Sequence, residues 1–133
     1  MDVREINRTV VEQFRAGGPV EGMRREMLLL LTTRGRRTGV ERTTPLMFHR
    51  HGDDLVVIAS NDGAPRHPDW YLNAVADPRV VVEIGDARYT ATAVPAQGAR
   101  RAELWASLVA AFPFFADHQA GVDREIPLVV LTG

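Results

Sequence analysis

The stretch RREMLLLLTTRGRRTGVERTTPLMFHR at residues 24–50 predicts a long β-hairpin. Residues 24–33 and 41–50 read as two strands, joined by a turn in which Gly35 and Gly39 are free to adopt positive φ. Pro45 has no amide hydrogen to give to a ladder, so we expect it at a sheet edge or a bulge. The tip of this hairpin is rich in arginine.

Four further strands and three helical segments are predicted outside the hairpin. Apolar residues at helical spacing over residues 3–15 predict an amphipathic N-terminal helix. Because most strands follow one another through short turns and are largely apolar, we expect about six mostly antiparallel strands closed into a small barrel with two to three flanking helices, an α+β fold. The other strands are expected at 55–60, 79–84, 88–94 and 126–132, the other helices at 69–76 and 99–112, and a loop or short helix at 114–125.

Length and composition restrict the possible functions. A chain of 133 residues fits a single domain at 1–133, with an N-terminal helical segment at 1–18 and the barrel at 24–133. The sequence contains neither cysteine nor lysine, which excludes disulfides, thiol nucleophiles and Schiff-base chemistry. The net charge is −1, so an anion site has to come from local clustering of arginines.

No apolar run is long enough to cross a bilayer, and the N-terminus carries charges where a signal peptide needs apolar residues. We therefore expect a cytoplasmic protein. The N-terminal helix either caps the barrel or makes peripheral contact with a membrane.

The hairpin tip is the first candidate site. Backbone amides of a glycine-bearing turn form a concave anion nest, and guanidinium groups add charge-assisted, bidentate contacts. A solvated basic hairpin is the alternative, whereas the near-neutral chain with few interleaved aromatics argues against nucleic acid. The candidate residues are Arg34, Arg36, Arg37, Thr38, Arg42, Thr43 and Thr44.

Three other segments could line a ligand site. The small polar loop 59–63 follows a strand and would let backbone approach a ligand closely. The helix start at 68–73 offers free amides to an anion, and its Trp70 lines a ring pocket or packs in the core. An aromatic lid over a planar ligand, or plain core, is predicted from Phe112, Phe114, Phe115 and His118.

The protein's own side chains offer little catalytic chemistry. Motifs of serine hydrolases, zinc proteases and EF-hands are absent from the sequence. His49 and His51 alternate on a strand and point to one face, but two histidines without a third ligand do not indicate a metal site. An enzyme built on this chain must therefore borrow its chemistry from a cofactor.

The motifs LLLTTRGRRTG, VIASNDG and HPDWYLN, in this order, resemble the deazaflavin-dependent nitroreductase family, a branch of the split β-barrel flavin and deazaflavin oxidoreductases. The similarity covers roughly residues 25–133. It implies a split β-barrel that binds coenzyme F420 and passes hydride from the reduced deazaflavin to an electron-poor acceptor such as a quinone, an enone or a nitroaromatic.

The resemblance also implies roles for individual residues. The anionic cofactor tail would be held by Arg36, Arg37, Thr38, Arg42, Thr43 and Thr44. The ring would lie between Ile58, Ala59, Ser60 and Asn61 on one side and Asp69, Trp70, Tyr71, Leu72 and Asn73 on the other. The substrate pocket would be formed by Met47, Phe112, Phe115 and His118, where nitroreductase relatives carry tyrosines. Ser60 or His118 would supply a proton.

Three alternatives remain open from the sequence. A related split barrel could use FMN, whose shorter phosphate tail needs fewer arginines than this hairpin offers. A non-catalytic F420 carrier would bind the cofactor without turning over, and an anion- or nucleic-acid-binding module would bind no flavin. On the main hypothesis we expect a small-molecule electron acceptor, a separate dehydrogenase that re-reduces F420, no metal, no nucleic-acid partner, and a monomer or homodimer.

Overall fold

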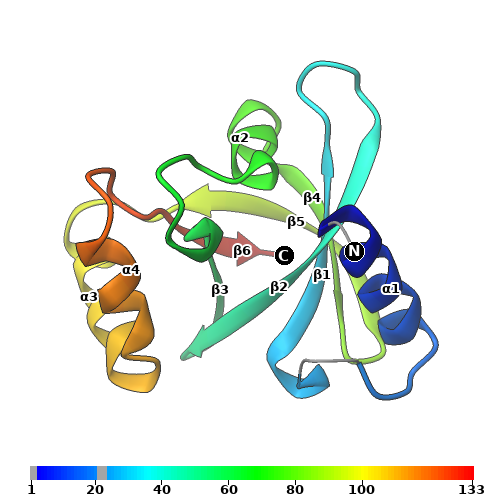
Figure 1. Ribbon diagram of the computed structural model, residues 1–133, viewed down its shortest axis with the longest axis horizontal. Helices are drawn as coiled ribbons and strands as arrows, with labels where there is room; N and C mark the ends of the chain where they lie inside the picture. Colours follow the sequence, from blue (N-terminus) through cyan, green and yellow to red (C-terminus); the bar gives the residue numbers. More distant parts are fainter. Residues whose placement is uncertain (1–2, 21–23) are drawn as a thin grey trace.

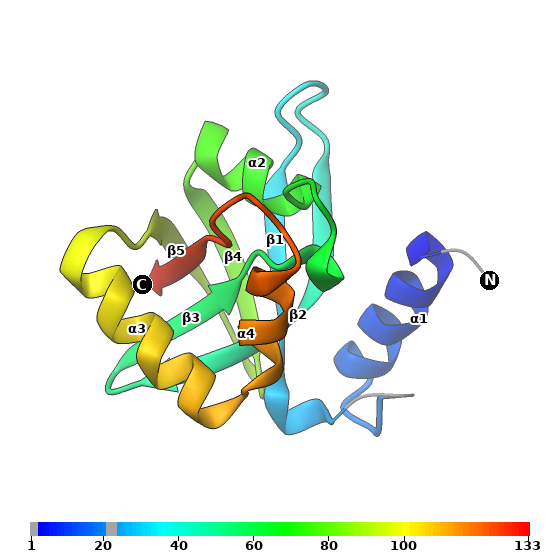
Figure 2. The same ribbon diagram turned by 60° about the vertical axis from the view of Figure 1, so that its left-hand side comes forward.

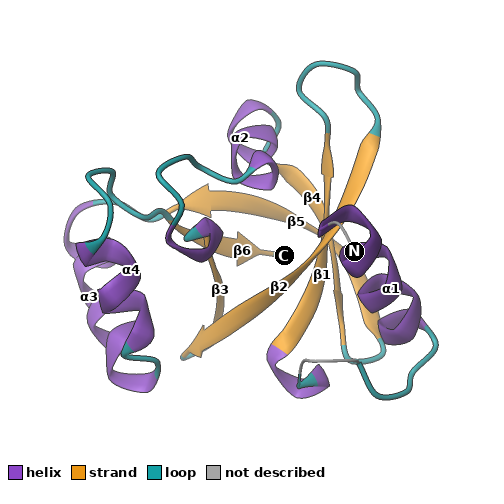
Figure 3. Cartoon of the chain, viewed as in Figure 1, coloured by secondary structure: helices purple, strands orange, loops and turns teal. Residues whose placement is uncertain are grey.

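Six antiparallel strands form a closed barrel in the computed structural model, which describes residues 3–20 and 24–133 (Figures 1 and 3). Residues 1–2 of the predicted N-terminal segment lie outside the described residues. The strand order around the barrel is β1-β2-β3-β6-β5-β4, and each neighbouring pair is antiparallel. The predicted antiparallel barrel is thus confirmed. The strands are β1 (Leu28–Arg34), β2 (Glu41–His51), β3 (Asp54–Ile58), β4 (Arg79–Ile84), β5 (Ala87–Pro95) and β6 (Leu128–Thr132).

Four α-helices surround the barrel in the described part of the chain, where two to three were predicted. The additional helix is α4 at residues 114–120, which lies within the segment predicted to be a loop or a short helix. Helix α1 lies on one side of the barrel, α3 and α4 lie on the opposite side, and α2 lies at one end beside the hairpin (Figure 2). Their bounds are α1 (Val3–Arg15), α2 (Asp69–Ala76), α3 (Gly98–Ala111) and α4 (Phe114–Ala120), with 3-10 turns η1 (Arg25–Met27) and η2 (Asn61–Gly63).

Alternation along the strands divides the buried residues into three layers, because successive side chains point to opposite faces of a strand. Leu29 and Leu31 of β1 pack in the barrel interior with Val57 of β3. Leu28 and Leu30 point outward to α1. The outward residues of β3 and β6 instead pack under α3 and α4, and these are Val56, Ile58, Leu128 and Val130.

Helix α1 packs on the barrel through its apolar face. Val10 and Phe14 are buried, and Arg15 forms an ion pair with Glu83 of β4 at 2.9 Å. Arg25 Nη1 donates to Phe14 O at 2.6 Å. Because this bond turns the chain toward the end of α1, residues 25–27 form η1, and the predicted strand at 24–33 is corrected to begin at Leu28. Within the described residues, none of the helices combines the length and apolarity needed to cross a membrane.

Two further strands are shorter than predicted. The strand expected at 55–60 ends at Ile58, because the carbonyls of Ala59 and Ser60 are taken by a side chain from another part of the chain. The strand expected at 126–132 begins at Leu128, since Ile126 N donates to the side chain of Gln119 instead.

The β1–β2 hairpin extends past the end of the barrel (Figure 1). Strand β2 pairs with β3 only from Phe48 onward, whereas Pro45 pairs with Leu30 of β1 alone. Pro45 therefore occupies the edge position predicted for it, where its missing amide hydrogen costs no ladder bond. The arginine-rich tip lies beyond this edge.

Candidate functional site

The tip of the hairpin is a closed loop that directs arginines outward. Gly35 N donates to Val40 O at 2.8 Å, and Gly39 N donates to Gly35 O at 2.8 Å. Gly39 has φ +74, a conformation that favours glycine. Arg37 and Arg42 are exposed, and neither makes a side-chain hydrogen bond or ion pair with another described residue. The backbone of the tip is thus satisfied while these cations are available to a ligand.

Arg36 has a different role from its neighbour Arg37, because it joins the hairpin to α2. Its Nη1 donates to Asn73 Oδ1 at 2.8 Å, and its backbone N donates to the same oxygen at 3.2 Å. Its Nη2 lies 3.3 Å from Asp69 Oδ1. The structure therefore brings Arg36, which is expected to contact the cofactor tail, together with Asp69 and Asn73, which are expected to lie beside the cofactor ring.

The threonines of the hairpin are less available than its exposed arginines. Thr43 Oγ1 lies 2.8 Å from Thr32 Oγ1 on the paired strand, and both Thr43 and Thr44 are half-buried. Thr38 Oγ1 accepts from Val40 N at 3.2 Å inside the tip. Of the three threonines expected to contact the cofactor tail, only Thr38, which is exposed, lies at the tip itself.

The loop after β3 begins with buried apolar side chains and continues with polar ones. Ile58 and Ala59 are buried in the two core layers on either side of the strand. Ser60 is 9% exposed, and Asn61 is exposed. Ligand contact in this loop would therefore come from Ser60, Asn61 and main-chain groups.

Arg124, which the sequence analysis did not single out, holds this loop in place. Its Nη1 donates to Ala59 O at 3.1 Å, its Nη2 donates to Ser60 O at 2.8 Å, and both Nε and Nη2 donate to Ala64 O. Nη1 also lies 3.0 Å from His67 Nδ1. No local sequence signal could have revealed this contact, because Arg124 lies about 60 positions away from the loop in sequence.

His67 is the second residue that the sequence analysis missed. Burial and the nearby charge of Arg124 lower the pKa of His67 below its usual range. Since arginine only donates, His67 Nδ1 must accept, which leaves the imidazole proton on Nε2. The imidazole packs against the ring of Tyr71 with centroids 4.9 Å apart.

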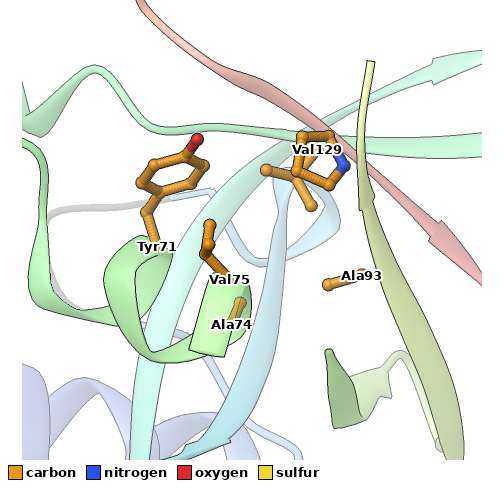
Figure 4. A pocket seen from close by; sticks show the side chains of 6 residues that line it. Tyr71, Ala74, Val75, Ala93 and Val129 are labelled. Atoms are coloured by element: carbon orange, nitrogen blue, oxygen red, sulfur yellow. The ribbon is translucent and has the colours of Figure 1, made fainter. Parts of the chain in front are cut away.

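Helix α2 contributes a core residue and a partly exposed ring. Trp70 is 6% exposed and belongs to the barrel interior. Of the two predicted roles, it therefore packs in the core. Tyr71 packs edge-on against Trp70 with centroids 6.2 Å apart. Tyr71 also leans from α2 over a shallow apolar crevice toward Val129 (Figure 4). Leu72 is half-buried.

The predicted pocket residues come together beside the 61–63 turn. Phe112 and Phe115 stack edge-on at 6.5 Å, and His118 lies edge-on to Phe115 at 5.9 Å. Met47 packs against the same layer. His118 lies against Gly63, and its Nδ1 is buried without a hydrogen-bond partner among the described residues. An orphaned imidazole nitrogen at this position can hydrogen-bond to a ligand once one enters.

His49 and His51 point to one face, as predicted, and meet Ser107 of α3. His49 Nε2 lies 2.8 Å and His51 Nδ1 3.1 Å from Ser107 Oγ. Burial and the neighbouring His51 lower the pKa of His49. In the described part of the chain, no group of three or more histidine or acidic side chains is placed to hold a metal ion. This cluster joins α3 to β2.

Comparison with known proteins identifies the family. The family model described as F420H(2)-dependent quinone reductase matches residues 5–133. An F420H(2)-dependent quinone reductase of Mycobacterium tuberculosis is 39% identical over 107 residues, covering 78% of this chain and 72% of that protein. Another protein of that species, described as a putative F420H(2)-dependent quinone reductase, is 34% identical over 77% of this chain and 87% of its own length.

Solved structures agree with this result. The structure of an F420-H2 dependent reductase superposes with a TM-score of 0.71 at 36% identity, covering 79% of this chain and 93% of that chain. A second structure, described as a domain-swapped dimer, gives a TM-score of 0.75 at 33% identity over 93% of this chain and 95% of that chain. The predictions of a split-barrel fold and of a deazaflavin-dependent oxidoreductase are confirmed. The chain belongs to the F420H(2)-dependent quinone reductase family.

Proposed function

We propose that this protein reduces quinones with F420H2, and that the hairpin tip and the loop after β3 hold the cofactor between them. The proposal rests on the Arg36 side chain, which bonds to Asn73 and Asp69 and so fixes the hairpin beside α2. This contact sets an exposed cationic tip next to α2, the helix that follows the loop on which a ring could lie. A long anionic tail and a flat ring require such a pair of neighbouring surfaces.

The residues of the tip suit the cofactor tail. Phosphate and carboxylate groups are best bound by guanidinium forks and by backbone amides of a glycine-bearing turn. Arg37 and Arg42 offer the exposed guanidiniums, and the tip backbone offers amides around Gly39. Arg36 contributes its remaining donors and anchors the tip, while Thr38, Thr43 and Thr44 line the approach.

The ring and the acceptor would lie on the loop and the aromatic layer. Ser60, Asn61 and Tyr71 would provide polar contacts to the ring. Ala59, Trp70 and Leu72 would support it from the barrel side, and Ile58 would support the loop from the layer under α3 and α4. The bound cofactor supplies a hydride, and a quinone that takes up this hydride and one proton becomes a hydroquinone. Met47, Phe112 and Phe115 would exclude water from the acceptor and align it, and Ser60 or His118 would deliver the proton.

Partners follow from this chemistry. A separate dehydrogenase would regenerate F420H2, because the chain itself offers no second reductant. We propose a homodimer as one form, since a similar chain is described as a domain-swapped dimer. Helix α1 has its main apolar face against the barrel, so peripheral membrane contact would use its exposed residues such as Ile6.

Oxygen-free stopped-flow kinetics test the proposal. Purified protein is mixed with F420H2 and a soluble benzoquinone, and return of the oxidised deazaflavin absorbance is followed. We expect turnover that depends on the protein, and a slower reaction with a nitroaromatic, because the pocket lacks tyrosine hydroxyls to bond a nitro group. Tight FMN binding without F420 binding would favour the FMN enzyme, and F420 binding without turnover would favour a carrier.

A further inference from the structure

The loop between β3 and α2 has an unusual backbone. Asn61, Asp62 and Gly63 have φ of 50°, 55° and 77°, so three consecutive residues lie in the left-handed region. Such a run is unfavourable for the two residues that carry a Cβ, and it persists only where surrounding contacts enforce it. In proteins, strained segments of this kind are concentrated at ligand sites.

Arg124 provides the enforcing contacts, and its charge is not neutralised. Its guanidinium makes hydrogen bonds to three carbonyl oxygens of the loop and to one imidazole nitrogen. Among the described residues, no carboxylate pairs with it, and its neighbour Glu125 pairs with Arg101 at 3.3 Å instead. Half-buried Arg124 therefore places a positive charge directly behind the loop.

Burial and, to a smaller extent, this charge lower the pKa of His67. Because Arg124 donates to Nδ1, His67 stays neutral and carries its proton on Nε2. Nε2 itself makes no hydrogen bond within the described part of the chain. The ring is half-buried, packed on Tyr71, and lies in sequence and in space between the loop after β3 and the start of α2. His67 is thus a fixed donor beside the proposed ring site.

We propose that His67 is a further ligand-binding residue, which donates from Nε2 to a carbonyl oxygen of the deazaflavin ring, and that Arg124 is the positioning residue that sets this donor and holds the strained loop. The inference rests on the proposed function. A neutral donor backed by a positive charge favours an acceptor oxygen that carries partial negative charge. The carbonyl groups of a deazaflavin ring are such acceptors.

The role of Arg124 is tested without cofactor. Nitrogen-15 NMR of the histidine rings is recorded against pH for the wild type, Arg124→Met and the matched control Arg66→Met, which removes the same charge from an exposed position of the loop. We expect His67 to hold the Nε2–H form in the wild type and in R66M. In R124M its pKa should rise toward the ordinary value and the tautomer preference should weaken. An unchanged His67 in folded R124M would overturn the positioning role.

The role of His67 is tested by binding of two ligands, F420 and the tail-less deazaflavin ribitol compound, followed by deazaflavin fluorescence. His67→Phe keeps the ring packing on Tyr71 and leaves the bonds from Arg124 to the carbonyls intact. It removes the donor, so we expect the Kd of both ligands to rise by about five- to twenty-fold. His67→Gln restores an amide acceptor and donor and should recover part of the affinity.

The outcomes separate the two proposals. The wild type can bind F420 while His67→Phe binds the tail-less ring with the same Kd as the wild type. In that case the role of His67 is wrong and the proposed function stands. If the wild type binds neither ligand, the proposed function fails and the ligand role of His67 fails with it, while the NMR titration still decides on Arg124. Should R124M not fold, Arg124→Gln, which removes the charge but keeps an amide donor for one loop carbonyl, takes its place in the titration.

Discussion

The hairpin tip and the loop after β3 both depend on arginine, but they use it in opposite ways. Arg37 and Arg42 at the tip are exposed and make no bond to another described residue. Arg124 satisfies three loop carbonyls and an imidazole at once. Whether an arginine serves the fold or a ligand thus depends on the acceptors within its reach, because buried carbonyls require a donor and exposed guanidiniums do not. Arg36 combines the two uses, because it bonds to Asn73 and Asp69 of α2 and also belongs to the proposed site of the cofactor tail.

The largest effect on folding is expected from Arg124→Met. This change leaves several loop carbonyls without their donor and should lower the free energy of unfolding by about 3–5 kcal/mol, since hydrogen bonds to a charged group are each worth about 1.5–3 kcal/mol. Urea unfolding followed by circular dichroism measures it. A loss no larger than that of Arg66→Met would mean that Arg124 contributes no more to folding than an exposed arginine of the same loop.

A smaller effect is expected from Asn73→Ala. Asn73 is 5% exposed and accepts from both the backbone and the guanidinium of Arg36. Its loss should cost about 2 kcal/mol, measured in the same urea experiment. Asp69→Ala is the control on the same guanidinium, because the Asp69 side chain is 87% exposed and such a pair contributes less than about 1 kcal/mol. Equal losses in the two variants would argue against Asn73 as the anchor of the hairpin.

Acid should weaken the loop more than the tip. The pKa of His67 is lowered in the folded protein from 6.5, so the unfolded chain takes up a proton first as the pH falls below that value. Stability is therefore complete above about pH 6.5 and is lost between that pH and the lower folded pKa. The lowered pKa of His49 acts in the same direction. Urea unfolding between about pH 7.5 and about pH 5.5 should show a smaller loss for His67→Gln than for the wild type, and identical losses would contradict the network.

The smallest effect on folding is expected at the tip. Arg37→Met and Arg42→Met remove exposed cations without internal partners, so each should change the free energy of unfolding by less than about 0.5 kcal/mol. Thermal unfolding at equal salt compares them with the wild type. A clear destabilisation would mean that the tip arginines serve the fold, like Arg124.

The difference between local signals and tertiary contacts explains which features could be predicted from the sequence. The apolar run from Leu28 to Leu31, the short turns between strands and the glycines of the hairpin are local signals, and they predicted the antiparallel barrel and the arginine-rich hairpin tip. The start of β1 was predicted too early because the bond from Arg25 to the end of α1 is a tertiary contact. Arg124 and His67 were missed for the same reason, since their meeting depends on the closed barrel and leaves no periodic pattern in the sequence.

On the proposed function, the cationic tip binds the anionic tail of F420. Binding of F420 and of its tail-less ring is compared by fluorescence in the wild type and in the double variant Arg37→Met/Arg42→Met, at low and high salt. We expect the wild type to bind F420 at least about tenfold more tightly than the tail-less ring, with an advantage that shrinks as salt is added and largely disappears in the double variant. A double variant that retains the full advantage of F420 over the tail-less ring would contradict the account.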